Sequence, residues 1–343
     1  MTGRQSNSSG AVLQRLGEAQ RQLPGRIEPE LHACQIELIS DPCSDAGEAV
    51  AQVRALRRAV IATGAGILGS GTHPSALEGE AEITDTERYE RIRELLGDAV
   101  ATPVAGLHVH VGMPDPGTAI RVFNGLRAHL PMLQALAANS PFRHGRDTGL
   151  ASAREVTLRS WPRSGVPRAL RDYEDFCTSA ALLARAADVP DYTWFWWKLR
   201  PHPRLGTVEV RALDVQTTLE ETEALVALIH CLCRHTADSP DGPELPPELV
   251  EEGLFRAARF GVRADLPDDQ GRLRPAHEVL LEALALITPH AQELNCAEQL
   301  KLLPPLIRRA GGAGRQRGYY EIAGMDTVLR ELTRATSGSA RSD

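Results

Sequence analysis

The stretch GLHVHVGM, residues 106–113, alternates apolar and polar side chains and has a glycine near each end. Successive side chains of a β-strand point to opposite faces, so three aliphatic residues share one face, and His108 and His110 share the other. The two imidazoles then lie roughly 6.6 Å apart along the strand, close enough to serve one metal or phosphate cluster. The glycines allow a ligand or another backbone to approach closely. The stretch therefore predicts a strand with chemistry on one face.

Two further segments show the same alternation. In TVEVRALDV, residues 207–215, Glu209 and Arg211 fall on the face opposite the aliphatic residues. Glu209 is a hard oxygen donor suited to Mg²⁺, and Arg211 is a planar fork suited to phosphate or carboxylate. In HACQIELIS, residues 32–40, Glu37 is a third acidic residue on a polar strand face. These strands indicate an open-sided active site, and a solvated sheet face with cross-strand ion pairs stays open as the alternative.

Helical signals surround these strands. Capping-box patterns at Thr84-x-x-Glu87 and Thr218-x-x-Glu221 each precede apolar residues at helical spacing, and Pro131 should kink or divide a helix over about 118–138. Other periodic segments lie near 44–64, 170–187, 248–260, 276–294 and 320–335, and a further strand is expected at 192–200. The mixed order lacks steady βα alternation. It favours an α+β fold over a doubly wound one.

Bulk properties exclude several classes of protein. A net charge of −7 over 343 residues argues against nucleic acid as a partner, because phosphate binding needs a positive face. No apolar run is long enough for a membrane span, and residues 1–10 lack the apolar core of a signal peptide, so the cytoplasm is the default location. The six cysteines indicate buried thiols rather than a disulfide framework. Residues 1–10 and 336–343 read as disordered tails around a single catalytic domain, 11–335, with a helical part from about 248.

Several segments, taken together, are similar to one known family. They are GTHP (71–74), GLHVHVG (106–112), NSPF (139–142), GRDTG and the following S-x-R (145–154), RPHPRLGTVEVRALDVQT (200–217) and QRGYYE (316–321). In this order they resemble the glutamate–cysteine ligase type 2 family, the bacterial carboxylate–amine ligases, over about residues 20–335. GLHVHVG followed by TVEVRALD is the more specific part of the resemblance, and GTHP alone is weak.

The resemblance implies a glutamine-synthetase-like fold, in which a curved antiparallel sheet flanked by helices holds metal, nucleotide and amino acid. Mg-ATP would phosphorylate the γ-carboxylate of a glutamate-like substrate, and an amine, typically that of cysteine, would displace phosphate. Phosphoryl chemistry of this kind relies on positioning and charge neutralisation and needs no protein nucleophile. The site residues that it implies are the metal ligands Glu37, His108 and Glu209, the phosphoryl-contacting Arg211, the catalytic and positioning Arg154, and the nucleotide-side His110 and Asn139.

The sequence also departs from the family. Members usually begin with a strand that carries an acidic E-x-E run of metal ligands, whereas this chain passes from MTGRQSNSSG into a helix-like segment, so this strand is expected to be missing and Mg²⁺ binding to be weakened. The family's E-N-x-W pattern is E-G-L-F at 252–255. Two alternatives therefore stay open: a zinc or binuclear hydrolase built on the His-x-His strand, and a binding protein that has lost turnover. The identity of the amine acceptor and homo-oligomer formation are also open.

Overall fold

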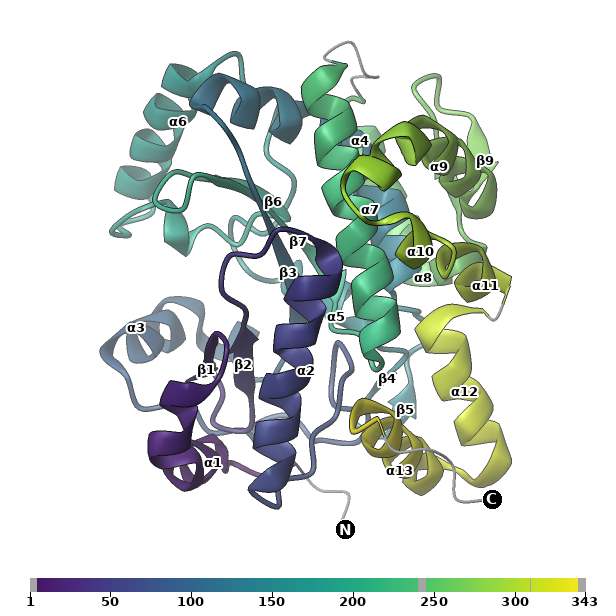
Figure 1. Cartoon of the computed structure of the whole chain (residues 1–343). Helices are drawn as coiled ribbons and strands as arrows, with labels where there is room; N and C mark the ends of the chain where they lie inside the picture. Colours follow the sequence, from purple (N-terminus) through teal and green to yellow (C-terminus); the bar gives the residue numbers. More distant parts are fainter. Residues whose placement is uncertain (1–4, 240–244, 309, 339–343) are drawn as a thin grey trace.

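The computed structural model describes residues 5–239, 245–308 and 310–338, which form helices and small antiparallel sheets (Figure 1). This confirms the predicted α+β class. The central sheet has the order β3 (Gly106–Gly112), β7 (Thr207–Asp214) and β6 (Leu199–His202). A separate antiparallel pair joins β1 (Arg26–Pro29) to β2 (Ile36–Ile39). Two-stranded ribbons complete the list: β4 (Phe142–Arg143) with β5 (Arg146–Asp147), and β8 (Asp265–Pro267) with β9 (Leu273–Pro275).

The central sheet has one apolar face and one polar face, as the alternation predicts. Val208 and Val210 of β7 and Leu199 of β6 are fully buried in the main core. Two long helices, α4 (Pro116–Ala137) and α7 (Leu219–Asp238), contact these strands (Figure 1). Burying one face in this way leaves the other for polar side chains, and register fixes which residues those are.

Local signals placed several helices correctly. Thr218 and Glu221 form the complete predicted capping box at the start of α7, in which each side chain accepts from the other residue's backbone N–H. Helix α4 continues through Pro131 as one element, so the predicted division does not occur. The remaining helices are α1 (Ser9–Leu16), α2 (Ala46–Ala62), α3 (Glu87–Leu96), α5 (Ala153–Leu158), α6 (Tyr173–Ala186), α8 (Pro247–Phe260), α9 (Ala276–Glu293), α10 (Ala297–Leu300), α11 (Leu303–Arg308), α12 (Gly311–Ala323) and α13 (Met325–Thr336).

Several predicted boundaries are wrong. The capping box expected at Thr84-x-x-Glu87 does not form, because the N-cap of α3 is Thr86, whose side chain accepts from the backbone N–H of Tyr89. The strand expected at 192–200 begins only at Leu199, because Tyr192–Trp194 form a 3-10 turn. The helix expected over 320–335 is two helices, because Gly324 has a positive φ of 75° that ends α12. The tail expected at 1–10 overlaps α1, which starts at Ser9; residues 1–4 and 339–343 of the two predicted tails lie outside the described residues.

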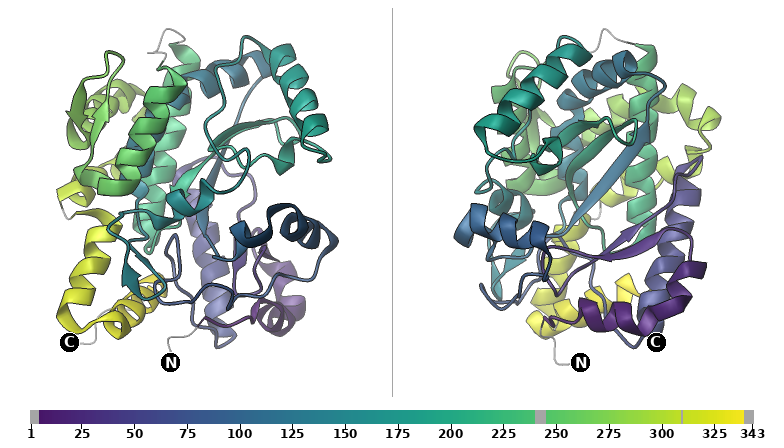
Figure 2. Two further views of the ribbon diagram at one scale, coloured as in Figure 1. Left: turned by 180° about the vertical axis from the view of Figure 1, so that it is seen from behind. Right: turned by 90° about the vertical axis from the view of Figure 1, so that its left-hand side faces the viewer.

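The main hydrophobic core draws on most of the chain. It contains residues from Leu31 to Leu303 and thus spans both sides of position 248, where the helical part was expected to begin. Helices α9, α10 and α11 pack against α7, and Figure 2 shows both described ends of the chain at the same end of the molecule. No helix among the described residues is long and apolar enough to cross a membrane.

Candidate functional site

The polar face of the central sheet is organised around the carboxylate of Glu209. Its side chain is only 2% exposed, yet it is surrounded by cationic groups. Arg200, directly opposite on β6, donates from Nε at 2.9 Å and from Nη2 at 2.7 Å to Glu209 Oε2. Arg211, two residues along β7, donates from Nη1 to Oε1. Both carboxylate oxygens are thus held by guanidinium groups, the strong charge-assisted form of hydrogen bond.

The two histidines of β3 reach the same carboxylate. His110 is the register partner of Glu209, and its Nε2 lies 3.4 Å from Glu209 Oε1. His108 Nδ1 lies 4.0 Å from the same oxygen. The register of β3 against β7 shifts between Leu107 and Val109, at the position of His108. The prediction that the imidazoles share a face with Glu209 and Arg211 is therefore confirmed.

The charges around Glu209 set the protonation of the cluster. Burial by itself raises the pKa of Glu209, but Arg211, the hydrogen bond from His110 and Arg200 outweigh it, and the pKa lies far below its ordinary value. Burial, followed by the charge of Arg211, lowers the pKa of His108 well below 6.5 although Glu209 opposes this. At neutral pH the face therefore holds an ionised carboxylate, two guanidinium groups and a neutral His108 imidazole.

A cluster of acids lies on the neighbouring β1–β2 pair. Glu28 of β1 is the direct partner of Glu37 of β2, and Glu30 follows β1. Burial, and then the charges of Glu30 and Glu28, raise the pKa of Glu37 to about 7, while Arg211 acts in the opposite direction. Burial likewise raises the pKa of Glu30, and Arg211 again opposes. Arg211 thus interacts with the sheet face and with the acidic cluster.

This cluster corrects one sequence prediction. The segment Glu28-Pro29-Glu30 is an E-x-E sequence within and directly after the first strand, so an N-terminal strand with such a sequence is present where none was expected. Pro29 and the preceding Gly25 read as turn residues in isolation. Only the long-range pairing with β2 shows that they belong to a strand.

The donor set fits a divalent cation on the β1–β2 side better than at Glu209. No group of three or more metal-ligating side chains in the described part of the chain is already close enough to hold an ion. Oxygen-rich carboxylates are nevertheless what Mg²⁺ prefers. Burial first, and then the charges of Glu30 and Glu28, raise the pKa of Glu37, and a cation bound there would offset the effect of the two neighbouring charges. At Glu209, by contrast, both oxygens are occupied by arginines.

Arg154 lies close to His108, because a Cβ built on Gly106 would meet both side chains. It is almost fully buried in α5, and its Nη2 donates to the carbonyl of Arg211 at 3.1 Å and its Nη1 to that of Ala212 at 3.4 Å. Gly106 of β3 makes room for it, since a Cβ there would lie 2.4 Å from Arg154 Nη2. Its charge also contributes to the lowered pKa of His108. In this arrangement Arg154 is hydrogen-bonded to the backbone of β7 and lies close to His108.

Asn139 belongs to a buried hydrogen-bond network next to the end of β7. Its side-chain NH₂ donates to the carbonyl of Val215 at 2.9 Å and to Thr217 Oγ1 at 3.1 Å, and its side-chain oxygen accepts from Gln316 at 2.9 Å. Its backbone N–H donates to Asp214 at 2.9 Å. Because the amide is already hydrogen-bonded inside the protein, the structure gives Asn139 a scaffolding position and not a place on the polar face.

Sequence comparison identifies the family. The model for "Glutamate-cysteine ligase family 2(GCS2)" matches residues 3–333. The chain belongs to glutamate–cysteine ligase family 2. Two similar proteins of Rubrobacter xylanophilus are named "Putative glutamate--cysteine ligase 2-1" and "2-3". They are 36% and 38% identical, over 92% and 91% of this chain and 88% and 87% of their own lengths.

Solved structures agree with membership of glutamate–cysteine ligase family 2 at the level of the fold. A glutamate–cysteine ligase of Francisella tularensis, solved in complex with AMP, has a TM-score of 0.68 at 13% identity, covering 91% of this chain and 81% of that one. A bifunctional glutathione synthetase of Pasteurella multocida has a TM-score of 0.65 at 16% identity, covering 93% of this chain and 48% of that one.

Sequence reasoning did not assign two residues of this family member's site, Arg200 and His202. Arg200, at the end of the strand expected over 192–200, lies on β6 and pairs with Glu209. The His202 ring lies 5.5 Å from that of His110 and 5.4 Å from that of Tyr192, edge to face in both cases. The alternation of Arg200 and His202 along RPHPR was the available signal, but the two prolines obscured it.

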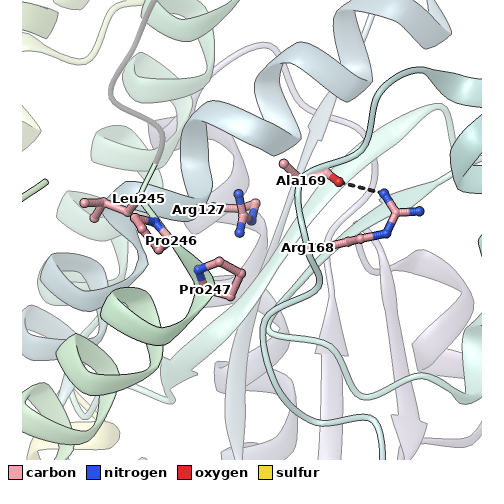
Figure 3. Close-up of a pocket in the computed structure, with 6 residues that line it drawn as sticks. All are labelled: Arg127, Arg168, Ala169, Leu245, Pro246 and Pro247. Carbon is pink, nitrogen blue, oxygen red and sulfur yellow. Dashed lines mark hydrogen bonds between the residues drawn. The ribbon is translucent and has the colours of Figure 1, made fainter.

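A separate pocket of about 380 Å³ lies away from this site (Figure 3). Arg127 and Arg168 line it together with Leu245–Pro247 at the start of α8. The Arg168 guanidinium is already bound by both oxygens of Asp175, at 2.7 Å each. None of its lining residues belongs to the polar sheet face, so we assign the candidate chemistry to the sheet.

Proposed function

We propose that this chain is an ATP-dependent carboxylate–amine ligase that forms a γ-glutamyl-type amide through an acyl phosphate. The observation that carries the proposal is the Glu209 cluster. A buried carboxylate holds Arg200 and Arg211 in fixed orientations on an open sheet face, beside the imidazoles of His108 and His110. Membership of glutamate–cysteine ligase family 2 supplies the reaction class.

The reaction suits such a face. A carboxylate is a poor electrophile until a phosphoryl group converts one oxygen into a leaving group, and the transfer moves a highly charged group. Guanidinium groups fixed in advance stabilise that charge without reorganising during the reaction. Glu209 would act as the orienting residue that holds Arg200 and Arg211. Arg211, which also interacts with Glu37, would contact the transferring phosphoryl group.

The remaining roles follow from position. Glu37, with Glu28 and Glu30, would hold Mg²⁺, which supplies charge neutralisation of the triphosphate when bound. His108, neutral at physiological pH, lies at the metal or phosphate side, and His110 at the nucleotide side beside His202. Arg154 would position β7 through its hydrogen bonds to the carbonyls of Arg211 and Ala212, next to His108. Asn139 would act indirectly, by holding the residues that follow β7. Residues 11–335 would form one catalytic domain.

The similar proteins support the choice of substrates. The Francisella ligase was solved with AMP, which supports ATP as the nucleotide here. The Rubrobacter relatives are named for glutamate and cysteine, which supports a glutamate-like carboxylate and an amino-acid amine. Because these are metabolites of the cytoplasm, we place the reaction there.

The test is ADP release from Mg-ATP with glutamate and a panel of amino acids, with mass detection of the amide. Wild type should release ADP only when both carboxylate and amine are present. His108→Ala and Glu209→Gln should lose turnover by at least about 100-fold, whereas His277→Ala, an exposed histidine of α9, and Glu298→Gln, an exposed carboxylate, should not. Turnover by both site variants at the wild-type rate would refute the assigned roles.

The alternatives predict different results. A non-catalytic relative would bind nucleotide, measured by calorimetry, without forming ADP. A zinc hydrolase would be purified with tightly bound zinc and would need no ATP. Either result would replace the ligase proposal.

A further inference from the structure

A buried ion pair connects the start of β6 to helix α5. Lys198, the residue before β6, is only 3% exposed, and the side chain of Glu155 in α5 is fully buried. Lys198 Nζ donates to Glu155 Oε2 at 2.5 Å. Apolar residues of similar volume often stabilise such a position equally well, because burying two charges removes both from water. The pair therefore calls for an explanation beyond stability.

The backbone of Arg211 is held from both sides by residues next to this pair. Its N–H donates to the carbonyl of Lys198 at 2.8 Å, beside the first paired residues of β6 and β7. Its own carbonyl accepts from Arg154 Nη2 at 3.1 Å. Arg154 directly precedes Glu155 in the first turn of α5, which lies beside β7 (Figure 1).

These contacts close on themselves and form what we call the Arg211 contact ring. It runs from the carbonyl of Lys198 through the backbone of Arg211 to the guanidinium of Arg154, along α5 to the carboxylate of Glu155, and back to the ammonium of Lys198. The side chains of Lys198, Arg154 and Glu155 are almost fully buried. Glu209 orients the guanidinium of Arg211, whereas the contact ring fixes the backbone from which that side chain extends.

Helix α5 has a second attachment that does not involve the ion pair. Ser152, its N-cap, accepts from the backbone N–H of Glu155 at 3.2 Å and donates to Asp214 Oδ1, at the end of β7, at 2.9 Å. Breaking the ion pair releases the attachment to β6 and leaves the attachment to β7 in place. Its loss should therefore displace Arg211 without unfolding the helix.

We propose that Lys198 and Glu155 are positioning residues that hold Arg211 where it can contact the transferring phosphoryl group. Their part in the reaction rests on the proposed ligase function, which assigns that contact to Arg211. A misplacement of about 1 Å at a reacting site can reduce turnover roughly 100-fold. Loss of an interaction that acts in the transition state lowers kcat and leaves KM largely unchanged.

The first test measures hydrogen exchange at the backbone amide of Arg211 and requires no turnover. Full-length protein is exchanged in D₂O and analysed by mass spectrometry with fragmentation to single residues. In Lys198→Met and in Glu155→Leu this amide should exchange at least about tenfold faster than in wild type, because its acceptor is no longer held in place. Unchanged exchange in both variants would overturn the proposal.

Arg159→Gln is the matched control. Arg159 Nε contacts the same carboxylate, Glu155 Oε1, at 3.2 Å, but Arg159 is 35% exposed and lies outside the contact ring. The Arg211 amide should exchange in this variant as it does in wild type. Equal acceleration in Arg159→Gln and Lys198→Met would contradict the specific role of the ring.

The second test measures steady-state ADP release at a temperature well below the melting temperature of each variant. In Lys198→Met kcat should decrease at least about tenfold, while KM for ATP and for glutamate stays within about twofold of wild type. Arg159→Gln should keep both parameters. A wild-type kcat in Lys198→Met would overturn the proposal. If the wild-type chain itself releases no ADP, the ligase function fails, and the exchange test still decides whether the pair holds Arg211.

A double variant separates positioning from stability. Lys198→Met combined with Glu155→Leu replaces the ion pair by apolar side chains, so its melting temperature should lie above that of either single variant. Apolar packing lacks the directed hydrogen bond that closes the ring, so kcat should stay at least about tenfold below wild type. Recovery of kcat together with the melting temperature would overturn the proposal. If Lys198→Met does not fold, Glu155→Leu compared with Arg159→Gln gives the same two measurements.

Discussion

Removing the charge of Glu209 should destabilise the fold as well as stop turnover. Glu209→Gln keeps the shape but leaves the buried Arg200 guanidinium without its counter-charge. Loss of one partner of a buried pair costs about 3–5 kcal/mol. Arg211 is 18% exposed and can turn toward water, and glutamine retains one oxygen acceptor for Arg200. We therefore expect a decrease of about 3 kcal/mol in the free energy of unfolding, near the lower end of that range.

The assay is urea unfolding at neutral pH, with Glu298→Gln as the control. The Glu298 side chain is 79% exposed, so its ion pair with Lys301 should contribute less than about 0.5 kcal/mol. The difference should also depend on pH. Because the folded-state pKa of Glu209 lies far below the ordinary value of 4.5, its stabilisation is complete above about pH 4.5 and decreases as the pH falls further. A Glu209→Gln variant as stable as wild type at pH 7 would refute the idea that the arginines depend on this carboxylate.

Three other perturbations probe the site and its scaffold. Glu37→Gln should raise the Mg²⁺ concentration for half-maximal ADP release at least about tenfold, while an unchanged Mg²⁺ requirement would remove Glu37 from the metal site. Burial and then His235 lower the pKa of His129 to about 4, so its contribution to stability is complete above pH 6.5 and is lost toward pH 4. Between pH 7 and pH 4.5 the free energy of unfolding of His129→Gln should therefore decrease by about 1–2 kcal/mol less than that of wild type, a figure that allows for the partial exposure of the side chain. Urea unfolding at the two pH values measures this difference. Asp214→Asn should cost about 3 kcal/mol, because the carboxylate accepts from Ser140 at 2.6 Å and from two further donors; thermal melts check this, and a melting temperature equal to wild type would contradict it.

Short-range patterns predicted the central strands because period-two alternation is a local property. Glu209 and Arg211 could be assigned to one face of β7 without knowledge of any partner strand, and the structure confirms the assignment. The capping box before α7 is equally local, since both of its hydrogen bonds lie within four residues. In each case the residues that carry the signal are also the residues that form the interaction.

The other features of the fold and site depend on contacts between residues distant in the sequence. Glu28 is placed opposite Glu37 by the β1–β2 register, and nothing within RIEP indicates that partner. Arg200 pairs with Glu209 only because β6 and β7 are neighbours. Asn139 lies in a motif typical of ligand-binding loops, but its amide is held by residues distant in sequence. Sequence position alone does not distinguish a side chain that faces a ligand from one that supports the residues around it.

The distribution of charge explains why one residue, Arg211, joins the two halves of the site. On the sheet face, two arginines surround a single glutamate, so that half attracts anions. On the other side, Glu28 of β1, Glu37 of β2 and Glu30, which directly follows β1, are close enough to act on one another's charge, so that half attracts cations. Arg211 acts on both. A nucleoside triphosphate with its divalent cation has the same division, a negative chain of phosphates with a positive ion bound at one side. Under the proposed ligase function, this division would suit the complete Mg-ATP better than either component alone, and binding of either component should strengthen binding of the other.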